Sequence, residues 1–252
     1  MHAPTIAAVP MAAAASPFQS LRTEAARAGV AMSAAQVALC ERFAALLVER
    51  NASVNLTAIT DPADIAHKHF LDSFTAAAVR RWTGRERLVD VGSGAGFPGL
   101  ALKIALPGLR VTLVESVGKK ARFLEEVVAA LGLEDVEVRN ERAEELGRTR
   151  RAAYDVGTAR AVGSIGADLE YLLPLLRVGG DAIIWKGRVD AELAGAERAL
   201  AALGGETLSI TATSAFGLGD VLPGRHLVVA RKARPTPDRY PRRALDVRKR
   251  PW

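Results

Sequence analysis

The stretch LVDVGSGAGFPGLAL, residues 88–102, places four glycines within eight positions between two apolar runs. A short apolar run that ends in a glycine-rich turn and leads into a helical pattern is typical of the first strand–helix unit of a parallel sheet. In such sheets, ligands bind beyond the carboxyl ends of the strands where the strand order reverses, and this first turn lies there. The stretch therefore predicts an α/β fold with a ligand site at residues 92–99.

The glycines bear on what this turn can contact. Gly92, Gly94 and Gly96 let the main chain adopt conformations barred to other residues, and they let a ligand touch the backbone. Pro98 suits the start of the following helix because it has no amide hydrogen to leave unpaired. A glycine-rich turn alone is a weak signal, since such turns also occur where nothing binds.

Beyond the turn, short apolar runs alternate with helical segments, which is the pattern of a parallel sheet covered by crossover helices. The expected strands are Leu88–Val91, Val111–Glu115, Val136–Arg139, Tyr154–Ala159 and Ala182–Lys186. The expected helices are residues 98–106, 118–131, 166–177 and 190–203. Because no helix separates residues 206–216 from 224–233, these two segments should pair as an antiparallel hairpin at one sheet edge.

The chain is expected to divide into four parts. These are a disordered extension over residues 1–17, a helical cap over 18–84, the α/β domain over 85–234 and a basic tail over 235–252. In the cap, the apolar residues Leu39, Phe43, Leu46 and Leu47 recur at helical spacing.

Charge is concentrated at the carboxyl end. The net charge is +6, and the last 22 residues contain nine Lys or Arg and two acids, a net of +7, so the first 230 residues carry −1. A local basic run suits RNA phosphates, whose binding then weakens with salt. A solvated tail with no partner has the same composition.

Composition also bears on the compartment. No window approaches the roughly 18 consecutive apolar residues of a membrane helix, so no membrane partner is expected. The only cysteine, Cys40, cannot form an internal disulfide. We therefore expect a soluble protein of the cytoplasm.

A carboxylate follows the second expected strand and suggests the kind of ligand. Glu115 lies 23 residues after Gly92, where it could accept hydrogen bonds from the ribose of an adenosine cofactor. Both NAD and S-adenosyl-L-methionine carry that ribose. The loop departs from the usual dinucleotide spacing of Gly-x-Gly-x-x-Gly, and Asp90 before it would repel a pyrophosphate and attract an ammonium or sulfonium group. S-adenosyl-L-methionine is therefore favoured over NAD.

The predicted architecture resembles that of class I S-adenosylmethionine-dependent methyltransferases, whose Rossmann-like sheet has seven mostly parallel strands with the last one antiparallel. More specific strings follow in order: NLTAITDPADIAHKHFLDS, DVGSGAGFPG, ESVGKKARFL, RAEE, YDVGTARAV and WKGR. In order and approximate spacing they resemble the bacterial RsmG (GidB) family over roughly residues 35–245.

This resemblance implies methyl transfer from S-adenosyl-L-methionine to N7 of one guanine in the 530 loop of 16S ribosomal RNA. Together, the loop pattern and the resemblance give these expected cofactor contacts: Asp90, Gly92, Gly94, Phe97, Glu115, Ala143, Glu144 and Arg160. At the carboxyl end, Leu245 and Val247 stand where the family usually has glycine and proline, which leaves the conformation of that segment open.

The residues present agree with methylation at N7, which carries a lone pair and no proton, so no general base is required. Cys40 lies in the cap, far from the strand ends where a cysteine nucleophile would be needed. Lys186 ends the fifth expected strand, but Asp155 begins the fourth, so the charged set used for ribose methylation cannot form. Arg160 and Lys186 are therefore expected to position the guanine or the RNA, with Arg188 beside them.

Other candidate sites are weaker. His67 and His69 are two apart on a helix and face different ways, so no metal site is expected. His69, Asp72 and Ser73 include the residue types of a hydrolase triad, but on one helix their geometry is wrong.

The leading hypothesis is a monomeric 16S ribosomal RNA (guanine-N7)-methyltransferase that acts on the RNA or on the 30S subunit. The alternatives are an NAD-dependent oxidoreductase and a non-catalytic RNA-binding module on a degenerate methyltransferase fold.

Overall fold

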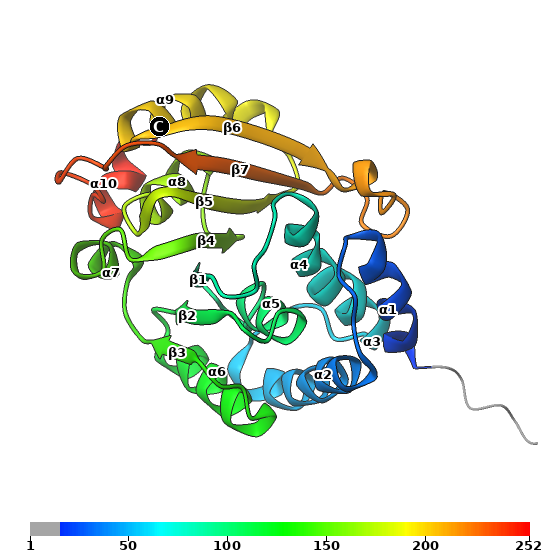
Figure 1. The fold of residues 1–252 in the computed structure, drawn as a ribbon. Helices are drawn as coiled ribbons and strands as arrows, with labels where there is room; N and C mark the ends of the chain where they lie inside the picture. Colours follow the sequence, from blue (N-terminus) through cyan, green and yellow to red (C-terminus); the bar gives the residue numbers. More distant parts are fainter. Residues whose placement is uncertain (1–15) are drawn as a thin grey trace, which may run out of the picture.

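The structure is a computed structural model that describes residues 16–252. Of the extension expected over residues 1–17, only the last two residues fall within this range. Seven strands form one sheet in the order β3-β2-β1-β4-β5-β7-β6 (Figure 1). The strands are β1 Arg87–Val91, β2 Arg110–Val114, β3 Val136–Arg139, β4 Tyr154–Arg160, β5 Leu176–Lys186, β6 Gly205–Ala212 and β7 His226–Lys232.

The strands run in the directions that the sequence predicted. Strands β1 to β5 pair in parallel, whereas β7 is antiparallel to both β5 and β6. The terminal hairpin therefore contributes β7 inside the sheet and β6 at its edge. The expected mostly parallel seven-stranded sheet is confirmed. Because the order reverses beside β1, the carboxyl ends of β1 and β4 flank the place where such sheets bind ligands.

Helices cover both faces of the sheet, so the central strands are buried on both sides (Figure 1). In β1, Leu88 packs into the core beneath the cap, whereas Val89 and Val91 pack into the core on the opposite face. This double burial explains why these strands appear in the sequence as continuous apolar runs rather than as an alternation.

The helices of eight or more residues are α1 Pro17–Arg27, α2 Ala34–Val54, α6 Gly118–Leu131, α8 Ile165–Leu172 and α9 Leu193–Leu203. Shorter α-helices are α3 Pro62–Ile65, α4 Asp72–Phe74, α5 Gly99–Ala105, α7 Ala143–Thr149 and α10 Ala244–Lys249. Between α3 and α4 the cap continues as one turn of π-helix, η1 Ala66–Leu71. The remaining 3₁₀ turns are η2 Thr75–Ala78, η3 Asp190–Glu192 and η4 Thr213–Phe216. No helix within residues 16–252 is both long and apolar enough to cross a membrane.

Two predicted boundaries were wrong. The helix expected over 166–177 ends at Leu172, and β5 begins already at Leu176. The apolar run between them fits either state by pattern, but Pro174 cannot continue a helix because it lacks an amide hydrogen. The helices α7 and α10 were not predicted, since six or seven residues are too few to show a helical period.

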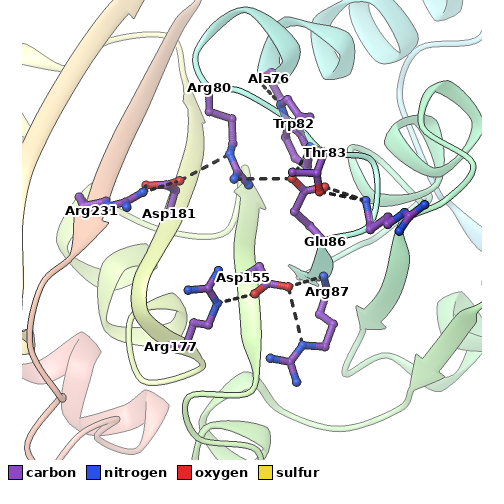
Figure 2. Close-up of polar contacts among 11 residues, drawn as sticks. Ala76, Arg80, Trp82, Thr83, Glu86, Arg87, Asp155, Arg177, Asp181 and Arg231 are labelled. Atoms are coloured by element: carbon purple, nitrogen blue, oxygen red, sulfur yellow. Dashed lines mark hydrogen bonds and ion pairs between the residues drawn. The ribbon is translucent and has the colours of Figure 1, made fainter.

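Arg80 ties the end of the cap to β5 and to the residue before β1, and Asp155 joins β4 to β1 nearby, far from the glycine turn (Figure 2). Arg80 lies between Glu86 and Asp181, with its Nη2 3.8 Å from Glu86 Oε1 and its Nε 3.5 Å from Asp181 Oδ2. Asp155 accepts a hydrogen bond from the Arg87 amide at 2.7 Å. The cap is thus fixed at this end, and its other end overhangs the carboxyl ends of the strands.

Candidate active site

The turn between β1 and α5 is anchored to the end of β2. The amides of Gly92 and Ser93 both donate to the Val114 carbonyl oxygen, at 2.9 and 3.1 Å. Gly92, Gly94 and Gly96 have φ angles of +69°, +55° and +96°, which residues with side chains seldom adopt. The structure confirms that the turn needs glycine for its backbone conformation.

The glycines of the turn differ in what lies next to them. A Cβ atom at Gly96 would lie 2.7 Å from Leu100 Cδ1, and one at Gly99 would lie 2.5 Å from Leu113 Cδ2. At Gly94, by contrast, the nearest atom to such a Cβ is the Gly92 carbonyl oxygen, at 3.7 Å. Gly96 and Gly99 therefore permit close packing inside the protein, whereas Gly94 leaves open space above the turn.

Glu115 lies one residue beyond β2 and is 6% exposed. Its Oε2 accepts a hydrogen bond from the Gly94 amide at 3.0 Å, and its Oε1 accepts one from the Val117 amide at 2.7 Å. A carboxylate offers about four acceptor positions, so acceptor capacity is left for hydroxyl donors of a ligand. The carboxylate is also fixed in place before any ligand arrives.

Asp90 is buried beneath the turn and is 1% exposed. Its Oδ2 accepts from the Gly99 amide at 3.1 Å, and its Oδ1 accepts from Thr158 Oγ1 at 2.8 Å. Burial raises the pKa of Asp90 to about 6, against the hydrogen bonds from Thr158 and Gly99. The structure thus gives Asp90 a role in holding the start of α5, and its attraction of a cationic ligand stays a prediction.

A pocket of about 350 Å³ opens at the carboxyl ends of β1, β2 and β4, and we call it the strand-end pocket. Three of the predicted cofactor residues, Gly92, Ala143 and Glu144, line it. The other five do not, and they are Asp90, Gly94, Phe97, Glu115 and Arg160. Sequence reasoning missed several further lining residues, which come from three later parts of the chain. They are Val162, Gly163, Ser164, Ala167, Tyr171, Ala244, Val247, Arg248, Pro251 and Trp252.

The carboxyl-terminal segment forms one wall of this pocket. Glu170, fully buried on α8, accepts a hydrogen bond from Arg242 Nη2 at 2.6 Å and one from Trp252 Nε1 at 2.8 Å. Val247 on α10 is 4% exposed, whereas Leu245 is 67% exposed. The alternative of a solvated tail does not hold for residues 242–252, because the buried carboxylate of Glu170 holds both Arg242 and Trp252.

Phe97 packs between the cap and the turn. Its ring stacks on Phe43 at a centroid distance of 4.8 Å and on His69 at 4.6 Å. Its side chain is 4% exposed, so most of its surface is already covered by protein. Phe97 therefore joins the cap to the glycine turn, and its expected contact with a cofactor stays a prediction.

Arg160 ends β4 and binds the cap. Its Nη1 lies 3.0 Å from Asp72 Oδ2 and 3.2 Å from the Lys68 carbonyl oxygen, and its Nη2 lies 3.3 Å from His69 Nδ1. The π-helical turn η1 brings these partners to one side of the cap. Asp72 is fully buried, and burial raises its pKa while Arg160 opposes the rise.

The contacts of His69 fix its protonation. Arg160 is always a donor, so Nδ1 of His69 must accept and Nε2 must carry the proton that it donates to Thr57 Oγ1 at 2.9 Å. Burial, together with the charge of Arg160, lowers the pKa of His69 to about 3. The imidazole is therefore neutral at physiological pH.

A second pocket of about 250 Å³, which we call the cap pocket, lies between the cap and the glycine turn. It shares Gly92 with the strand-end pocket, so the two meet at the turn. Its lining residues are Leu56, Thr57, Ile59, Lys68, His69, Gly92, Ser93, Gly94, Ala95, Phe97, Arg160, Ala161 and Arg225. Arg160 thus faces the cap pocket.

Lys186 was expected to face the RNA, and the structure places it in an internal ion pair. Its Nζ lies 3.2 Å from Glu192 Oε2 and 3.5 Å from Asp168 Oδ2, and it donates to the Gly163 carbonyl oxygen. Its side chain is 10% exposed. Because these partners occupy the ammonium group, Lys186 holds the 161–164 loop rather than presenting a free cation. Arg188, two residues on, is exposed.

The structure gives no support to the metal site, the hydrolase triad or a cysteine nucleophile. Within residues 16–252, no group of three His, Cys, Asp or Glu side chains is placed to hold a metal ion. Ser73 Oγ donates to the His69 carbonyl oxygen at 2.5 Å, so its hydroxyl is used by the helix. Cys40 is buried in α2.

Sequence reasoning considered His69 only as a metal ligand or part of a triad and Asp72 only as part of a triad, and it missed their contact with Arg160. Nothing in the local pattern signals it, since the partners are about 90 residues apart and meet only when the cap folds over β4.

Known proteins share the fold. One chain from the structure titled as a complex between the Haloferax volcanii Trm112 methyltransferase activator and the putative methyltransferase is 14% identical, with a TM-score of 0.55, over 75% of this chain and 98% of that chain. The cyclase SpnF is 16% identical, with a TM-score of 0.55, over 81% and 97% of the two chains. At such identities, the similarity concerns the fold alone.

Sequence relatives are much closer. The family model described as rRNA small subunit methyltransferase G (GidB) matches residues 36–218. Proteins named ribosomal RNA small subunit methyltransferase G are 45% identical in Exiguobacterium sp., over 93% of this chain and 97% of the relative, and 46% identical in Roseiflexus castenholzii, over 88% and 94%. With its glycine turn, buried strand-end carboxylate and seven-stranded sheet, the chain belongs to the rRNA small subunit methyltransferase G (GidB) family.

Proposed function

We propose that this protein transfers a methyl group from S-adenosyl-L-methionine to N7 of a guanine in 16S ribosomal RNA. The observation that carries the proposal is family membership over most of the chain, combined with the glycine turn and Glu115 at adjacent strand ends. The RNA is the substrate in the 30S subunit or during its assembly, and the protein acts as a monomer in the cytoplasm.

The residues at the strand ends suit S-adenosyl-L-methionine. Glu115 has acceptor capacity for ribose hydroxyls, and Gly94 presents bare main chain beside it. Ala143 and Glu144 line the pocket together with the aromatic residue Trp252, which suits an adenine ring. The volume of about 350 Å³ lies within the range of small-molecule sites.

When bound, S-adenosyl-L-methionine supplies an electrophilic methyl group on a sulfonium. The lone pair of guanine N7 forms the new bond to carbon, and the electron pair of the broken carbon–sulfur bond passes to sulfur. The positive charge moves to the guanine, and no proton is transferred. The protein therefore needs to bind, orient and shield the two reactants, and such positioning can supply roughly 7–11 kcal/mol.

Exposed cations near the site can attract the RNA. Arg188 follows β5, and Arg248, Lys249 and Arg250 lie on the exposed side of α10 and just beyond it. Lys186 is excluded from this set by its ion pairs. Affinity for the RNA should therefore fall with rising salt concentration.

The test is methylation of small ribosomal subunits from a strain that lacks the methyl mark, with S-adenosyl-L-methionine that carries a labelled methyl group. We expect mass spectrometry of RNA fragments to place the label on N7 of one guanine in 16S RNA. Glu115→Ala should abolish labelling, and Glu125→Ala on the exposed side of α6 should not. Label on another base, or binding of NADH without binding of S-adenosylhomocysteine, would refute the proposal.

A further inference from the structure

The cap pocket has the place, size and lining of a site for one RNA base. It shares Gly92 with the strand-end pocket, so the two pockets adjoin at the start of the glycine turn. A group bound in one pocket can therefore lie next to a group bound in the other. Two reactants that must meet in line for methyl transfer would be placed in this way.

The volume of the cap pocket suits a single base. At about 250 Å³, the pocket lies just below the range typical of drug-sized ligands, and it is too small for a base pair. Leu56 and Ile59 supply apolar wall on the cap side, and His69 and Phe97 present a stacked pair of rings. Apolar and aromatic surfaces of this kind hold bases that have been turned out of their stack.

The free donors in the pocket match the carbonyl of a guanine. Three N–H groups of the Arg160 guanidinium are engaged by Asp72, Lys68 and His69, and a guanidinium has five, so two remain. N7 must keep its lone pair free in order to attack, so a donor that occupied N7 would block the reaction. The acceptor next to N7 on the same edge of guanine is O6, and Arg160 can serve it.

The charges in the pocket are also compatible with this reaction, in which guanine becomes positive. The guanidinium of Arg160 is paired with the fully buried carboxylate of Asp72 at 3.0 Å. His69 is held neutral by the donor on its Nδ1. The charge of Arg160 is therefore largely compensated, which limits its repulsion of the developing charge.

Arg225 is the other cation that lines the pocket. It is partly exposed, and within residues 16–252 its side chain makes no ion pair within 4 Å. An unpaired guanidinium at the rim suits a phosphate of the RNA backbone, which it can bind through two parallel hydrogen bonds.

We propose that the cap pocket receives the target guanine after it has left its stack, with Arg160 donating to O6 and Arg225 binding a neighbouring phosphate. Asp72 and His69 act as positioning residues that hold Arg160. This inference rests on the proposed function, and it assigns the RNA base to a pocket separate from that of the methyl donor.

The test fills the pocket and measures two properties. Ile59→Trp places a large side chain in the cap pocket, and the matched control Ile210→Trp places one on the edge strand β6, where Ile210 is 36% exposed. One measurement is the affinity for S-adenosylhomocysteine by calorimetry, and the other is the rate of methylation of small subunits at saturating S-adenosyl-L-methionine. We expect Ile59→Trp to lower methylation at least about tenfold with unchanged S-adenosylhomocysteine affinity, and Ile210→Trp to resemble the wild type.

Methylation by Ile59→Trp at the wild-type rate would overturn the inference and leave the proposed function intact. If Ile59→Trp also loses S-adenosylhomocysteine binding or fails to fold, Arg225→Ala decides the matter. A loss of methylation through a higher KM for subunits, with unchanged S-adenosylhomocysteine affinity, supports the inference, and unchanged methylation overturns it. Failure of the wild type to methylate any guanine would instead refute the proposed function.

Discussion

Replacing three glycines by alanine should separate backbone strain, packing and ligand contact. Gly132, Gly94 and Gly96 all have positive φ, at +62°, +55° and +96°, so each alanine costs about 1–2 kcal/mol for its backbone conformation. Gly132 follows α6, and a Cβ added there would have no other atom within 4 Å. Gly132→Ala therefore measures the backbone cost alone.

Packing adds to this cost only at Gly96. A Cβ there would lie 2.7 Å from Leu100 Cδ1, 3.0 Å from Phe43 Cζ and 3.2 Å from Leu124 Cδ2. These side chains are buried in one core, and overpacking of a core costs about 1–3 kcal/mol. We expect Gly96→Ala to lose about 2–5 kcal/mol of unfolding free energy, and Gly94→Ala to lose no more than Gly132→Ala.

The affinities of the three variants for S-adenosylhomocysteine should follow a different order from their stabilities. The Gly94 amide donates to Glu115 Oε2 at 3.0 Å, and the backbone strain of Gly94→Ala should displace this carboxylate from the place where it would hold the ribose. This variant should therefore lose most of its S-adenosylhomocysteine affinity while it stays folded. Gly132→Ala should bind as the wild type does. Urea unfolding gives the stabilities and calorimetry gives the affinities. The reasoning is refuted if Gly94→Ala binds normally, or if Gly96→Ala is no less stable than Gly132→Ala.

Three further predictions concern buried titratable groups. Because the pKa of Asp90 is about 6 in the folded protein, against an ordinary value of 3.8, its contribution to stability is present below pH 4 and lost as the pH rises through 6. Between pH 4 and 7, the unfolding free energy of Asp90→Asn, measured in urea, should therefore rise by up to about 3 kcal/mol relative to that of the wild type. Parallel curves of unfolding free energy against pH for the two proteins would contradict this. The pKa of His69 is about 3 in the folded protein, against an ordinary value of 6.5, so its contribution to stability is present above pH 6.5 and is lost as the pH falls. Below pH 6, the unfolding free energy of the wild type should therefore fall by about 1.4 kcal/mol per pH unit relative to that of His69→Gln. Burial raises the pKa of the Cys40 thiol, so it should react with a thiol reagent only in urea, and rapid reaction of the folded protein would show that α2 opens.

The parts of the fold that could be predicted are those written in short sequence ranges. Each parallel strand is a local apolar run, and the turn at residues 92–99 carries its own backbone requirement in its glycines. The contacts of Lys186 could not be predicted in this way. Its partners Asp168 and Glu192 lie on two other elements, and pairing of charges across elements leaves no periodic signal in the sequence.

The carboxyl-terminal segment shows the same limit in another form. Its basic composition was evident, but Arg242 meets Glu170 across 72 residues. This contact and that of Trp252 with the same carboxylate show that the segment folds onto α8. A buried carboxylate that is left unpaired costs several kcal/mol, so Glu170 and Arg242 each require the other.

Cations that are paired inside the protein therefore have to be subtracted before the charge available to RNA is judged. Of the nine basic residues that follow position 230, Arg231 is paired with Asp181 and Arg242 with Glu170, two acids outside the segment. Lys232 is 2% exposed and donates to the Leu173 carbonyl oxygen, and burial lowers its pKa to about 7. These three cations hold the segment in place and are not available to phosphates. Of the cations that remain, Arg248, Lys249 and Arg250 lie on or just beyond α10, which also forms a wall of the strand-end pocket. Under the proposed function, attraction of the RNA is therefore strongest beside the pocket proposed for the methyl donor.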